Sequence, residues 1–368
     1  MKICFCNLTA GFKSGGLETY CWEAGRALAG IGHQVDVMGG RGGMARHPDV
    51  QLLAFAYTPR DRFPALGNRF RKFMERRSFA RHALPALLGG GYDAVVINKP
   101  YDFPLLWQAR RRGLKAVTVF RSGGTEFWPG DRFFAVAVDR WASSSAYNAC
   151  QVEARYGRKV AVIHNGVDTD RFTPRPGTAD ARRTRGLPED ALLLVSVGRL
   201  VGWKGLAVVV DALADLPVAV HYLVIGDGPE RQALQRRAAT LGVAGRVHFA
   251  GHLAHADLPA WLALGDLYLQ PSIGEEAFGI SVVEAMACGL PALVADQGGL
   301  PEIVADESVG RRLPPGNGQA WRAAIAEFAA DPRLRQAAGA AARRRAEAAF
   351  TWKANAGRLL DLIAGGSR

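Results

Sequence analysis

Two glutamates near the start of a predicted helix are the residues best placed to bind a polar ligand. Glu276 precedes the helix and Glu284 lies one to two turns inside it, after a predicted strand at 267–270. A helix N-terminus offers free N–H groups and the positive end of the dipole, which suit a phosphate. Glycine in Phe278-Gly279 would let a ligand approach the backbone. Carboxylates bind paired hydroxyls well, so the segment predicts a sugar or ribose beside a phosphate. The alternative is an ordinary strand–helix unit with solvated glutamates.

A basic pair, Arg199 and Lys204, follows another predicted strand at 192–197. The planar guanidinium can bind two phosphate oxygens at once, and the ammonium adds a compact point charge. Together with the helix start, they would stabilise negative charge on a departing phosphate. Taken alone, the two residues could equally be surface charges near a turn.

Short apolar runs alternate with helical patterns along the chain, which predicts parallel sheets built from strand–helix–strand units. The expected strands are 2–8, 34–38, 92–98, 116–120, 160–164, 192–197, 219–225, 247–250, 267–270 and 291–295. Expected helices include 16–31 and segments that begin near residues 206, 229 and 280.

The pattern predicts two doubly wound α/β domains in tandem. The first is expected at 1–172 and the second at 186–350, with a linker at 173–185, where Thr173-Pro174-Arg175-Pro176-Gly177-Thr178 would interrupt any regular element. A terminal helix at 351–368 is expected to pack back on the first domain. Ligands of such sheets bind at the carboxyl ends of the strands, so a shared ligand is expected in a cleft between the domains.

Composition excludes several classes of protein. The 368 residues are 49% hydrophobic and 22% charged, which is too apolar for a disordered chain. No apolar run approaches the ~18–20 residues of a spanning helix, and the first residues are interpreted as a buried strand instead of a signal peptide. The five scattered cysteines indicate free thiols in a reducing cytosol, and hence a cytoplasmic protein.

The net charge of +12 is concentrated in the first half, where residues 1–170 hold 24 Lys and Arg against 14 Asp and Glu. An anionic partner is therefore expected: nucleic acid, an acidic membrane or a phosphorylated substrate. Residues 60–82 predict a basic amphipathic helix, and an expected membrane or anionic-acceptor face comprises Arg69, Arg71, Lys72, Arg76 and Arg77. The alternative is a normal helix that packs its apolar stripe on the domain.

The whole segment 271–291 resembles the glutamate-x7-glutamate signature of retaining glycosyltransferases of family 4, which have the GT-B fold. Further segments match in the family's order, namely Val197-Gly198-Arg199-Leu200 with Lys204-Gly205, Ile225-Gly226-Asp227-Gly228-Pro229-Glu230, Gly298-Gly299-Leu300-Pro301-Glu302, and Asn165-Gly166-Val167-Asp168 with Phe172. In the first half, Gly15-Gly16 followed by Glu18 is similar to the family's glycine loop near the donor diphosphate. The resemblance extends from residue 1 to about residue 350.

The resemblance implies two Rossmann-like domains facing each other, and transfer of a hexose or related sugar from a nucleoside-diphosphate sugar to a glycan or glycolipid hydroxyl with retention. It implies catalytic roles for Arg199, Lys204 and Glu276, and a donor site made of Gly15, Gly16, Arg199, Lys204, Leu253, Glu276, Phe278, Gly279, Ile280, Ser281 and Glu284. No metal or cofactor is expected, and UDP is the expected carrier. A pathway of bacterial cell-surface polysaccharide or lipopolysaccharide synthesis would fit, with the enzyme peripheral on the inner face of the cytoplasmic membrane.

The acceptor side departs from the family pattern. Many relatives have a histidine after a strand of the first domain, whereas the comparable segment here, 119–126, has none. Arg121 or Glu126 could replace it, or both could be structural loop residues. Two rival functions remain open: a nucleotide-sugar epimerase on a similar fold, and a non-catalytic anion-binding protein. Nucleic acid is not expected as a partner, because no RNA- or DNA-binding motif is present.

Three histidines, His248, His252 and His255, have a spacing that invites a zinc interpretation. They span a strand end and a loop, without a cysteine or a helical histidine pair, so metal binding is not predicted. In the resemblance, Leu253 of this loop matches a position whose backbone lies near the nucleotide base.

Overall fold

The computed structural model describes residues 1–13, 15–43, 48–175 and 178–365. The chain divides into two compact units, one of residues 1–166 and 352–368 and one of residues 167–351. The sequence placed the end of the first domain at residue 172, but Val167 and Phe172 are buried in the core of the second unit. Helix α14 (Trp352–Ile363) belongs to the first unit, and residues 366–368 of the predicted terminal helix lie outside the described residues.

The predicted linker at 173–185 is also shorter in the structure. Residues Ala179–Arg183 form helix α6 of the second unit. The guanidinium of Arg182 is buried there, where it donates to the carbonyl of Leu264 at 2.7 Å and pairs with Asp266 at 2.9 Å. These contacts anchor residues 179–183 in the second unit, so this part of the predicted segment is not a linker. Pro176 and Gly177 lie outside the described residues.

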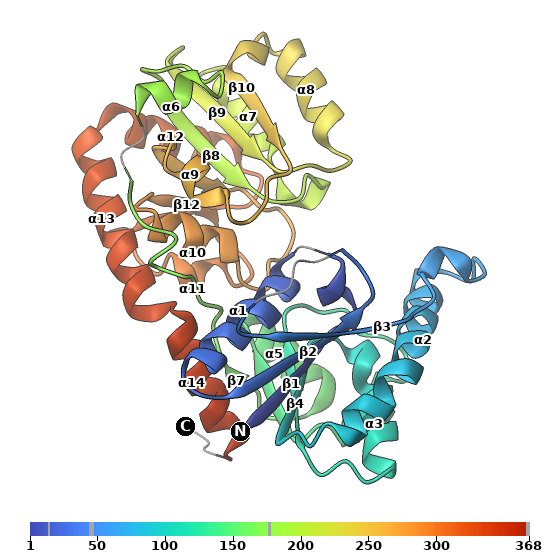
Figure 1. Cartoon of the computed structure of the whole chain (residues 1–368). Helices are drawn as coiled ribbons and strands as arrows, with labels where there is room; N and C mark the ends of the chain where they lie inside the picture. Colours follow the sequence, from blue (N-terminus) through green and yellow to red (C-terminus); the bar gives the residue numbers. More distant parts are fainter. Residues whose placement is uncertain (14, 44–47, 176–177, 366–368) are drawn as a thin grey trace. The chain divides into compact units, whose positions relative to one another are not determined.

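The first unit is built on a seven-stranded parallel sheet in the order β3-β2-β1-β4-β5-β6-β7 (Figure 1). The strands are β1 (Lys2–Cys6), β2 (Gln34–Gly40), β3 (Gln51–Phe55), β4 (Ala94–Ile97), β5 (Val117–Ser122), β6 (Arg140–Ser143) and β7 (Ala161–Val162). Its helices are α1 (Gly16–Gly30), α2 (Asn68–Gly89), α3 (Phe103–Arg111), α4 (Asp131–Phe134), α5 (Ala146–Tyr156) and α14, with short 3-10 turns η1 (Leu8–Gly11), η2 (Arg60–Arg62), η3 (Pro100–Asp102) and η4 (Ala135–Ala137).

Helices cover both faces of this sheet, because alternate residues of a strand point to opposite sides. In β1, Ile3 and Phe5 pack in a cluster with α1 and α14. Cys4 and Cys6 pack on the other face in a cluster with α2, α3 and α5. Strands buried on both faces explain why the sequence shows continuous apolar runs instead of alternation.

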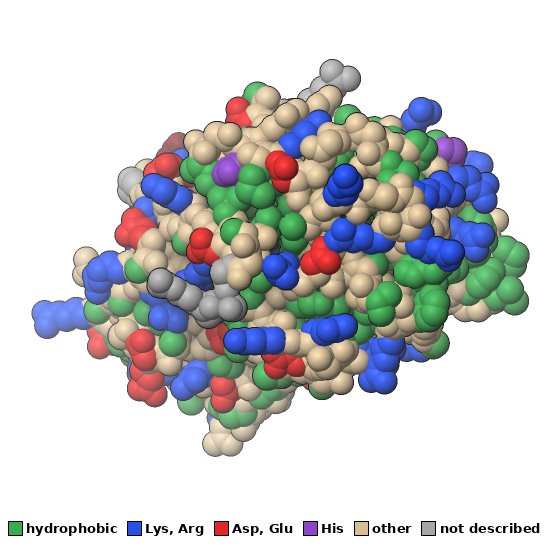
Figure 2. All heavy atoms as spheres, turned by 90° about the horizontal axis from the view of Figure 1, so that it is seen from below, with side chains coloured by type: hydrophobic (Ala, Val, Ile, Leu, Met, Phe, Trp, Pro, Cys, Tyr) green, Lys and Arg blue, Asp and Glu red, His purple; other side chains and the backbone are tan. Residues whose placement is uncertain are grey.

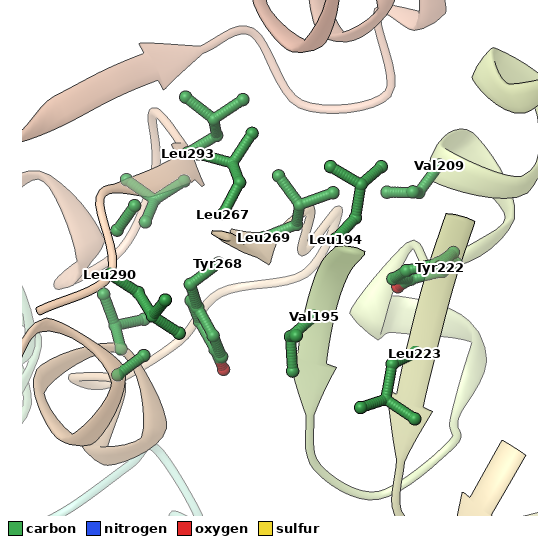
Figure 3. Packing of buried hydrophobic residues seen from close by; sticks show 14 of the residues in the cluster. Leu194, Val195, Val209, Tyr222, Leu223, Leu267, Tyr268, Leu269, Leu290 and Leu293 are labelled. Carbon is green, nitrogen blue, oxygen red and sulfur yellow. The ribbon is translucent and has the colours of Figure 1, made fainter. Parts of the chain in front are cut away.

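The second unit has a six-stranded parallel sheet in the order β10-β9-β8-β11-β12-β13. Its strands are β8 (Leu192–Val197), β9 (Val220–Ile225), β10 (Val247–Gly251), β11 (Leu267–Gln270), β12 (Ala292–Ala295) and β13 (Gly310–Leu313). Its helices are α6, α7 (Ala207–Leu213), α8 (Arg231–Thr240), α9 (Leu258–Leu262), α10 (Ile280–Ala287), α11 (Leu300–Ile303), α12 (Gly318–Ala330) and α13 (Pro332–Ala349), with turns η5 (Gly202–Lys204) and η6 (Ala244–Arg246). Figure 3 shows the aliphatic and tyrosine side chains of β8, β9 and β11 packed in its core.

The sequence missed three short strands, β3, β6 and β13, which lie toward the edges of their sheets. Each is four or five residues long, and β6 and β13 contain arginine. The observed strand orders also reveal what the sequence could not, namely where each sheet changes winding direction. In the second unit this switch point lies between β8 and β11, and ligands of doubly wound sheets bind beside the carboxyl ends of such strands.

Candidate active site

The switch point of the second unit brings together two of the predicted site residues. Lys204 lies in η5, in the loop after β8, and Glu276 lies in the loop after β11. The Lys204 ammonium donates to Glu276 Oε1, and both side chains are largely buried. The Lys204 ammonium also lies beside Gly198, which directly precedes Arg199. Arg199 is exposed and forms no ion pair within the described part of the chain.

A buried polar network that the sequence did not predict holds Glu276. Gln270 Nε2 and Ser272 Oγ each donate to Glu276 Oε1 at 3.0 Å. Tyr268 Oη lies 3.1 Å from Gln270 Oε1 and 2.9 Å from the hydroxyl of Ser281, a predicted donor-site residue. Burial raises the pKa of Tyr268, so its hydroxyl stays protonated. The network therefore links the start of α10 to Glu276 through side chains of β11.

The backbone of the Glu276 loop is fixed from two sides. The Ile273 and Gly274 amides donate to the Trp203 carbonyl at 2.9 and 3.0 Å, which ties this loop to the one after β8. On the other side, Gly299 N–H donates to the Glu276 carbonyl at 2.7 Å. A Cβ at Gly298, where φ is +64°, would lie 2.4 Å from the same carbonyl, so this close approach requires glycine.

Helix α10 begins at Ile280 after Gly279, whose φ of 122° favours glycine. A Cβ on Gly279 would also lie 2.8 Å from Leu300 Cδ2. The Phe278 ring is buried against Phe350, with ring centroids 5.7 Å apart. Phe278 was predicted in the donor site, and its side chain has a core position; only its backbone can face a ligand. Ile280 and Leu253, also predicted there, are partly buried against the core of the same unit.

Glu284 is buried and has partners of its own. His255 Nε2 lies 2.6 Å from Glu284 Oε1, and Arg171 Nη2 lies 3.1 Å from His255 Nδ1. Glu276 and Glu284 therefore share one feature: in each, Oε1 is hydrogen-bonded to side chains, whereas Oε2 accepts no hydrogen bond from a described residue. Each glutamate is thus oriented and retains an acceptor oxygen for a ligand hydroxyl.

The sequence missed His255 and Gln270. His255 was considered only as a metal ligand, and its actual neighbours are 29 and 84 residues away. Gln270 is the last residue of a strand at the switch point, and only this position at a strand end could have indicated it as a site residue from the sequence. The three histidines of the zinc interpretation diverge, because His248 instead pairs with His221 at 3.0 Å. No cluster of three or more metal-ligating side chains occurs among the described residues.

In the first unit, Gly15 caps helix α1, which begins at Gly16, and both glycines are exposed. Glu18, in the first turn, is buried and accepts a hydrogen bond from Thr9 Oγ1 in the turn after β1. In the sheet of this unit the strand order changes direction between β1 and β4.

The two predicted acceptor-side residues have structural environments. Arg121 is 1% exposed and lies over the Tyr20 ring, with its guanidinium carbon 3.9 Å from the ring centroid; it donates to Asn165 Oδ1. Burial lowers the pKa of this guanidinium. Arg121 is a core residue and cannot reach an acceptor directly, so of the two alternatives left open for it the structure favours a structural role.

Glu126 is exposed and pairs with Lys99 at 3.1 Å and Lys72 at 3.4 Å. Burial alone would raise the pKa of Glu126, but these two lysines hold it below its ordinary value. An ionised, doubly paired carboxylate is a poor proton acceptor. The pairing also means that Lys72 is not fully available to an external anion.

The predicted basic helix at 60–82 also differs from the structure. Residues Arg60–Arg62 form the turn η2, and helix α2 begins only at Asn68, after Pro64 and Gly67. Arg76, predicted on the anionic face, is buried and pairs with Asp102. Arg71 donates to the Phe63 and Pro64 carbonyls. Of the five basic residues predicted there, Arg69 and Arg77 remain exposed and without an ion pair among the described residues.

A different surface of the first unit combines apolar and basic side chains. Phe133 of α4 is 64% exposed and Val136 of η4 is 68% exposed. The Phe133 ring packs 5.9 Å from that of Trp107 in α3, and the Arg111 guanidinium lies 4.7 Å from the Trp107 ring centroid. Arg112, Lys115 and Arg132 are exposed nearby in sequence. Figure 2 shows Lys and Arg side chains gathered on the right of the view, toward α2 and α3, beside hydrophobic surface.

No helix within the described ranges is both long and apolar enough to span a membrane.

Comparisons with known proteins identify the family of the chain. Residues 178–345 match the model of the family "Glycosyl transferases group 1", and residues 14–171 match "Glycosyltransferase Family 4". A D-inositol 3-phosphate glycosyltransferase of Streptomyces avermitilis is 34% identical over 63% of this chain, although the match spans only 53% of that protein. A GDP-mannose-dependent alpha-(1-6)-phosphatidylinositol monomannoside mannosyltransferase of Mycolicibacterium smegmatis is 31% identical, over 70% of this chain and 72% of that one.

Among solved structures, the Anabaena HepE protein in complex with UDP and glucose is similar over 99% of both chains, with a TM-score of 0.83 and 22% identity. This likeness concerns the fold, and it confirms the two-domain α/β architecture expected from the sequence.

Proposed function

The chain belongs to family 4 of the glycosyltransferases and has their GT-B fold, and from this premise we propose that it is a retaining, metal-independent hexosyltransferase. It moves a hexose or related sugar from a nucleoside-diphosphate sugar to a hydroxyl of a glycan or glycolipid. The observation that carries the proposal is the Lys204–Glu276 pair at the switch point between β8 and β11.

The charges of this site suit departure of a nucleoside diphosphate. As the glycosidic bond to the diphosphate breaks, negative charge develops on the leaving phosphate. Arg199, Lys204 and the N-terminus of α10 supply positive potential on the loops of one switch point. These groups can do what a divalent cation does in other transferases, which is why we propose a reaction that EDTA does not inhibit.

The glutamates recognise the two sugars of the donor. Glu276 has three donors on Oε1, so its carboxylate is rigid and its Oε2 can accept from the transferred sugar. Glu284, inside α10, accepts from the ribose. Neither Arg121 nor Glu126 is placed as a general base, which agrees with front-face attack, in which the donor phosphate itself takes the proton of the acceptor.

UDP is the first carrier to test and GDP the second. The Anabaena structure contains UDP, and the Mycolicibacterium relative is named for GDP-mannose. A panel of UDP-, GDP-, ADP- and dTDP-sugars should include one that stabilises the protein thermally and is slowly hydrolysed. Lys204→Met should reduce that hydrolysis by on the order of 100-fold, whereas the exposed Lys353→Met of α14 should not change it.

The panel also separates the rivals. An epimerase would convert a donor with no acceptor and would release no free sugar. A non-catalytic anion-binding protein would hydrolyse no donor, and Glu276→Ala would leave its binding unchanged. Hydrolysis that continues undiminished in Lys204→Met would contradict the assigned role of the ion pair.

We also propose that the first unit contacts the anionic inner face of the cytoplasmic membrane, where a lipid-linked acceptor would lie. The support is the exposure of Phe133 and Val136, together with the packing of Phe133 and Arg111 against Trp107. Aromatic side chains with arginine suit the interface of an acidic bilayer, and each basic residue near it contributes about 1 kcal/mol.

Vesicle sedimentation tests this contact. The protein should bind vesicles that contain phosphatidylglycerol and should bind pure phosphatidylcholine weakly. Phe133→Ser with Val136→Ser should reduce the binding, while Val218→Ser, which is 80% exposed in the second unit, should not. Equal binding by both variants would exclude this surface as the contact.

A further inference from the structure

His255 contacts the one glutamate that the proposed function assigns to the ribose. It lies between β10 and α9, whereas Glu284 lies on α10 and Arg171 lies near the start of the second unit, which begins at Val167. The three side chains form a chain of hydrogen bonds, Arg171 to His255 at 3.1 Å and His255 to Glu284 at 2.6 Å. We propose that His255, with its tautomer set by Arg171, is a positioning residue that orients Glu284 for ribose recognition.

The tautomer follows from the chemistry of the partners. A guanidinium has only N–H donors and no acceptor, so His255 Nδ1 must be the unprotonated, accepting nitrogen. The imidazole proton is therefore on Nε2, which donates to Glu284 Oε1. A histidine in the other tautomer would present a lone pair to the carboxylate and an N–H to the guanidinium, and both contacts would be lost.

The position of the imidazole is fixed from a third side. Its ring lies 5.5 Å, centroid to centroid, from that of Phe172, which is fully buried. The Phe172 carbonyl accepts from Arg343 of α13 at 2.6 Å, and the Arg171 guanidinium carbon lies 4.9 Å from the Phe172 ring centroid. The donor to Glu284 is thus held by packing as well as by hydrogen bonds.

The consequence concerns the remaining oxygen of Glu284. This carboxylate is nearly buried, and His255 is its one hydrogen-bond donor within the described residues. With Oε1 engaged, the carboxylate plane is set and Oε2 points its lone pairs in a fixed direction. Without His255 the Glu284 side chain would lose this hydrogen bond and sample other rotamers, so a ribose would meet a less organised acceptor.

Two substitutions of His255 distinguish the effect of its Nε2–H donor from the effect of side-chain size. The amide nitrogen of glutamine reaches about where imidazole Nε2 lies, so His255→Gln can still donate to Glu284. Asparagine reaches only to the Nδ1 position, so His255→Asn keeps a partner for Arg171 and loses Glu284. His252→Asn, at an exposed histidine of the same loop, is the matched control.

The experiment is calorimetric binding of UDP, GDP and ADP, each beside its 2′-deoxy and 3′-deoxy analogues. We expect wild type to bind the ribonucleotide more tightly than one of its deoxy analogues. In His255→Asn this preference should fall about tenfold, because one hydrogen bond to a charged group is lost. Affinity for the deoxy analogue should hardly change. His255→Gln and His252→Asn should keep the preference. Glu284→Ala should abolish it, and adding His255→Asn to Glu284→Ala should cost nothing further.

Each outcome decides between the two proposals. A preference kept in His255→Asn but lost in Glu284→Ala would overturn the role of His255 and leave the proposed function intact. A preference that survives Glu284→Ala, or no binding of any diphosphate, would overturn both. Loss in His255→Gln equal to that in His255→Asn would refute the Nε2 donor. Should His255→Asn not fold, Arg171→Met, which frees the tautomer, must still reduce the preference.

Discussion

Replacement of Arg76 by methionine tests whether this residue stabilises the first unit or serves a membrane face. Arg76 lies on α2 and Asp102 in η3, and their side chains are 6% and 3% exposed. Removing one partner of a buried ion pair leaves an uncompensated charge, which typically costs about 3–5 kcal/mol. We therefore expect Arg76→Met to lower the free energy of unfolding of the first unit by about that amount, and the exposed neighbour Arg77→Met to change it by less than about 0.5 kcal/mol.

The destabilisation caused by Arg76→Met should decrease as the pH is lowered. Burial raises the pKa of Asp102 in the folded protein, although Arg76 opposes the shift. A carboxyl whose folded pKa exceeds its unfolded pKa is penalised when ionised, and the penalty fades as pH falls through the folded pKa. Without Arg76 this pKa rises further, so Arg76→Met should be less destabilising at pH 5 than at pH 7.

Hydrogen exchange with peptide resolution, recorded as a function of urea concentration, measures the free energy of unfolding of the first unit separately from that of the second. Adding Asp102→Leu to Arg76→Met should restore most of the lost stability, because an apolar pair can replace a buried ion pair. A stabilising role for Arg76 would be refuted by an Arg76→Met protein whose free energy of unfolding lies within about 1 kcal/mol of wild type but which no longer binds anionic vesicles. That result would support the assignment of Arg76 to the membrane face predicted from the sequence.

Three further perturbations have clear expected outcomes. Alkylation of the native protein at pH 8 should modify the exposed Cys150 quickly. Burial raises the pKa of Cys288 to about 12, so this thiol should stay unmodified until the protein unfolds. Mass spectrometry of the labelled peptides checks both expectations. Gly279→Ala should destabilise the protein by about 1–3 kcal/mol and abolish diphosphate binding, while Gly318→Ala, with open space at its Cβ, should do neither in a thermal-shift assay. Gln270→Leu should lower donor hydrolysis while diphosphate affinity falls less, because it removes a donor that orients Glu276; comparable losses in kcat and affinity would argue against that role.

Local patterns were sufficient for the elements that position the site. The run at 267–270 and the glycines at 279 and 289 delimit β11 and α10 almost to the residue, because they act within a few positions along the chain. The same local signals were too weak for β6 and β13, where tertiary pairing with a neighbouring strand makes a strand from four residues.

The basic helix shows where local pattern misleads. Charge and apolar spacing at 60–82 predicted one continuous helix with an outward basic face. Pro64 and Gly67 delay the helix to Asn68, and Arg76 turns inward because Asp102, 26 residues later, lies opposite it. Nothing in the spacing of α2 distinguishes Arg76 from Arg77, since the partner belongs to another element.

The sequence by itself determined the strand–helix alternation and the family, and it singled out the two glutamates as candidates, because these follow from residue type and spacing along the chain. Only the tertiary structure decided what surrounds them. The strand order places β8 beside β11, which lets Lys204 meet Glu276 across 72 residues, and the loop after β10 brings His255 to Glu284. Such partners depend on which strands pair and which loops meet at their ends. Hydrogen bonds between residues far apart in the sequence produce no periodic pattern from which they could be predicted.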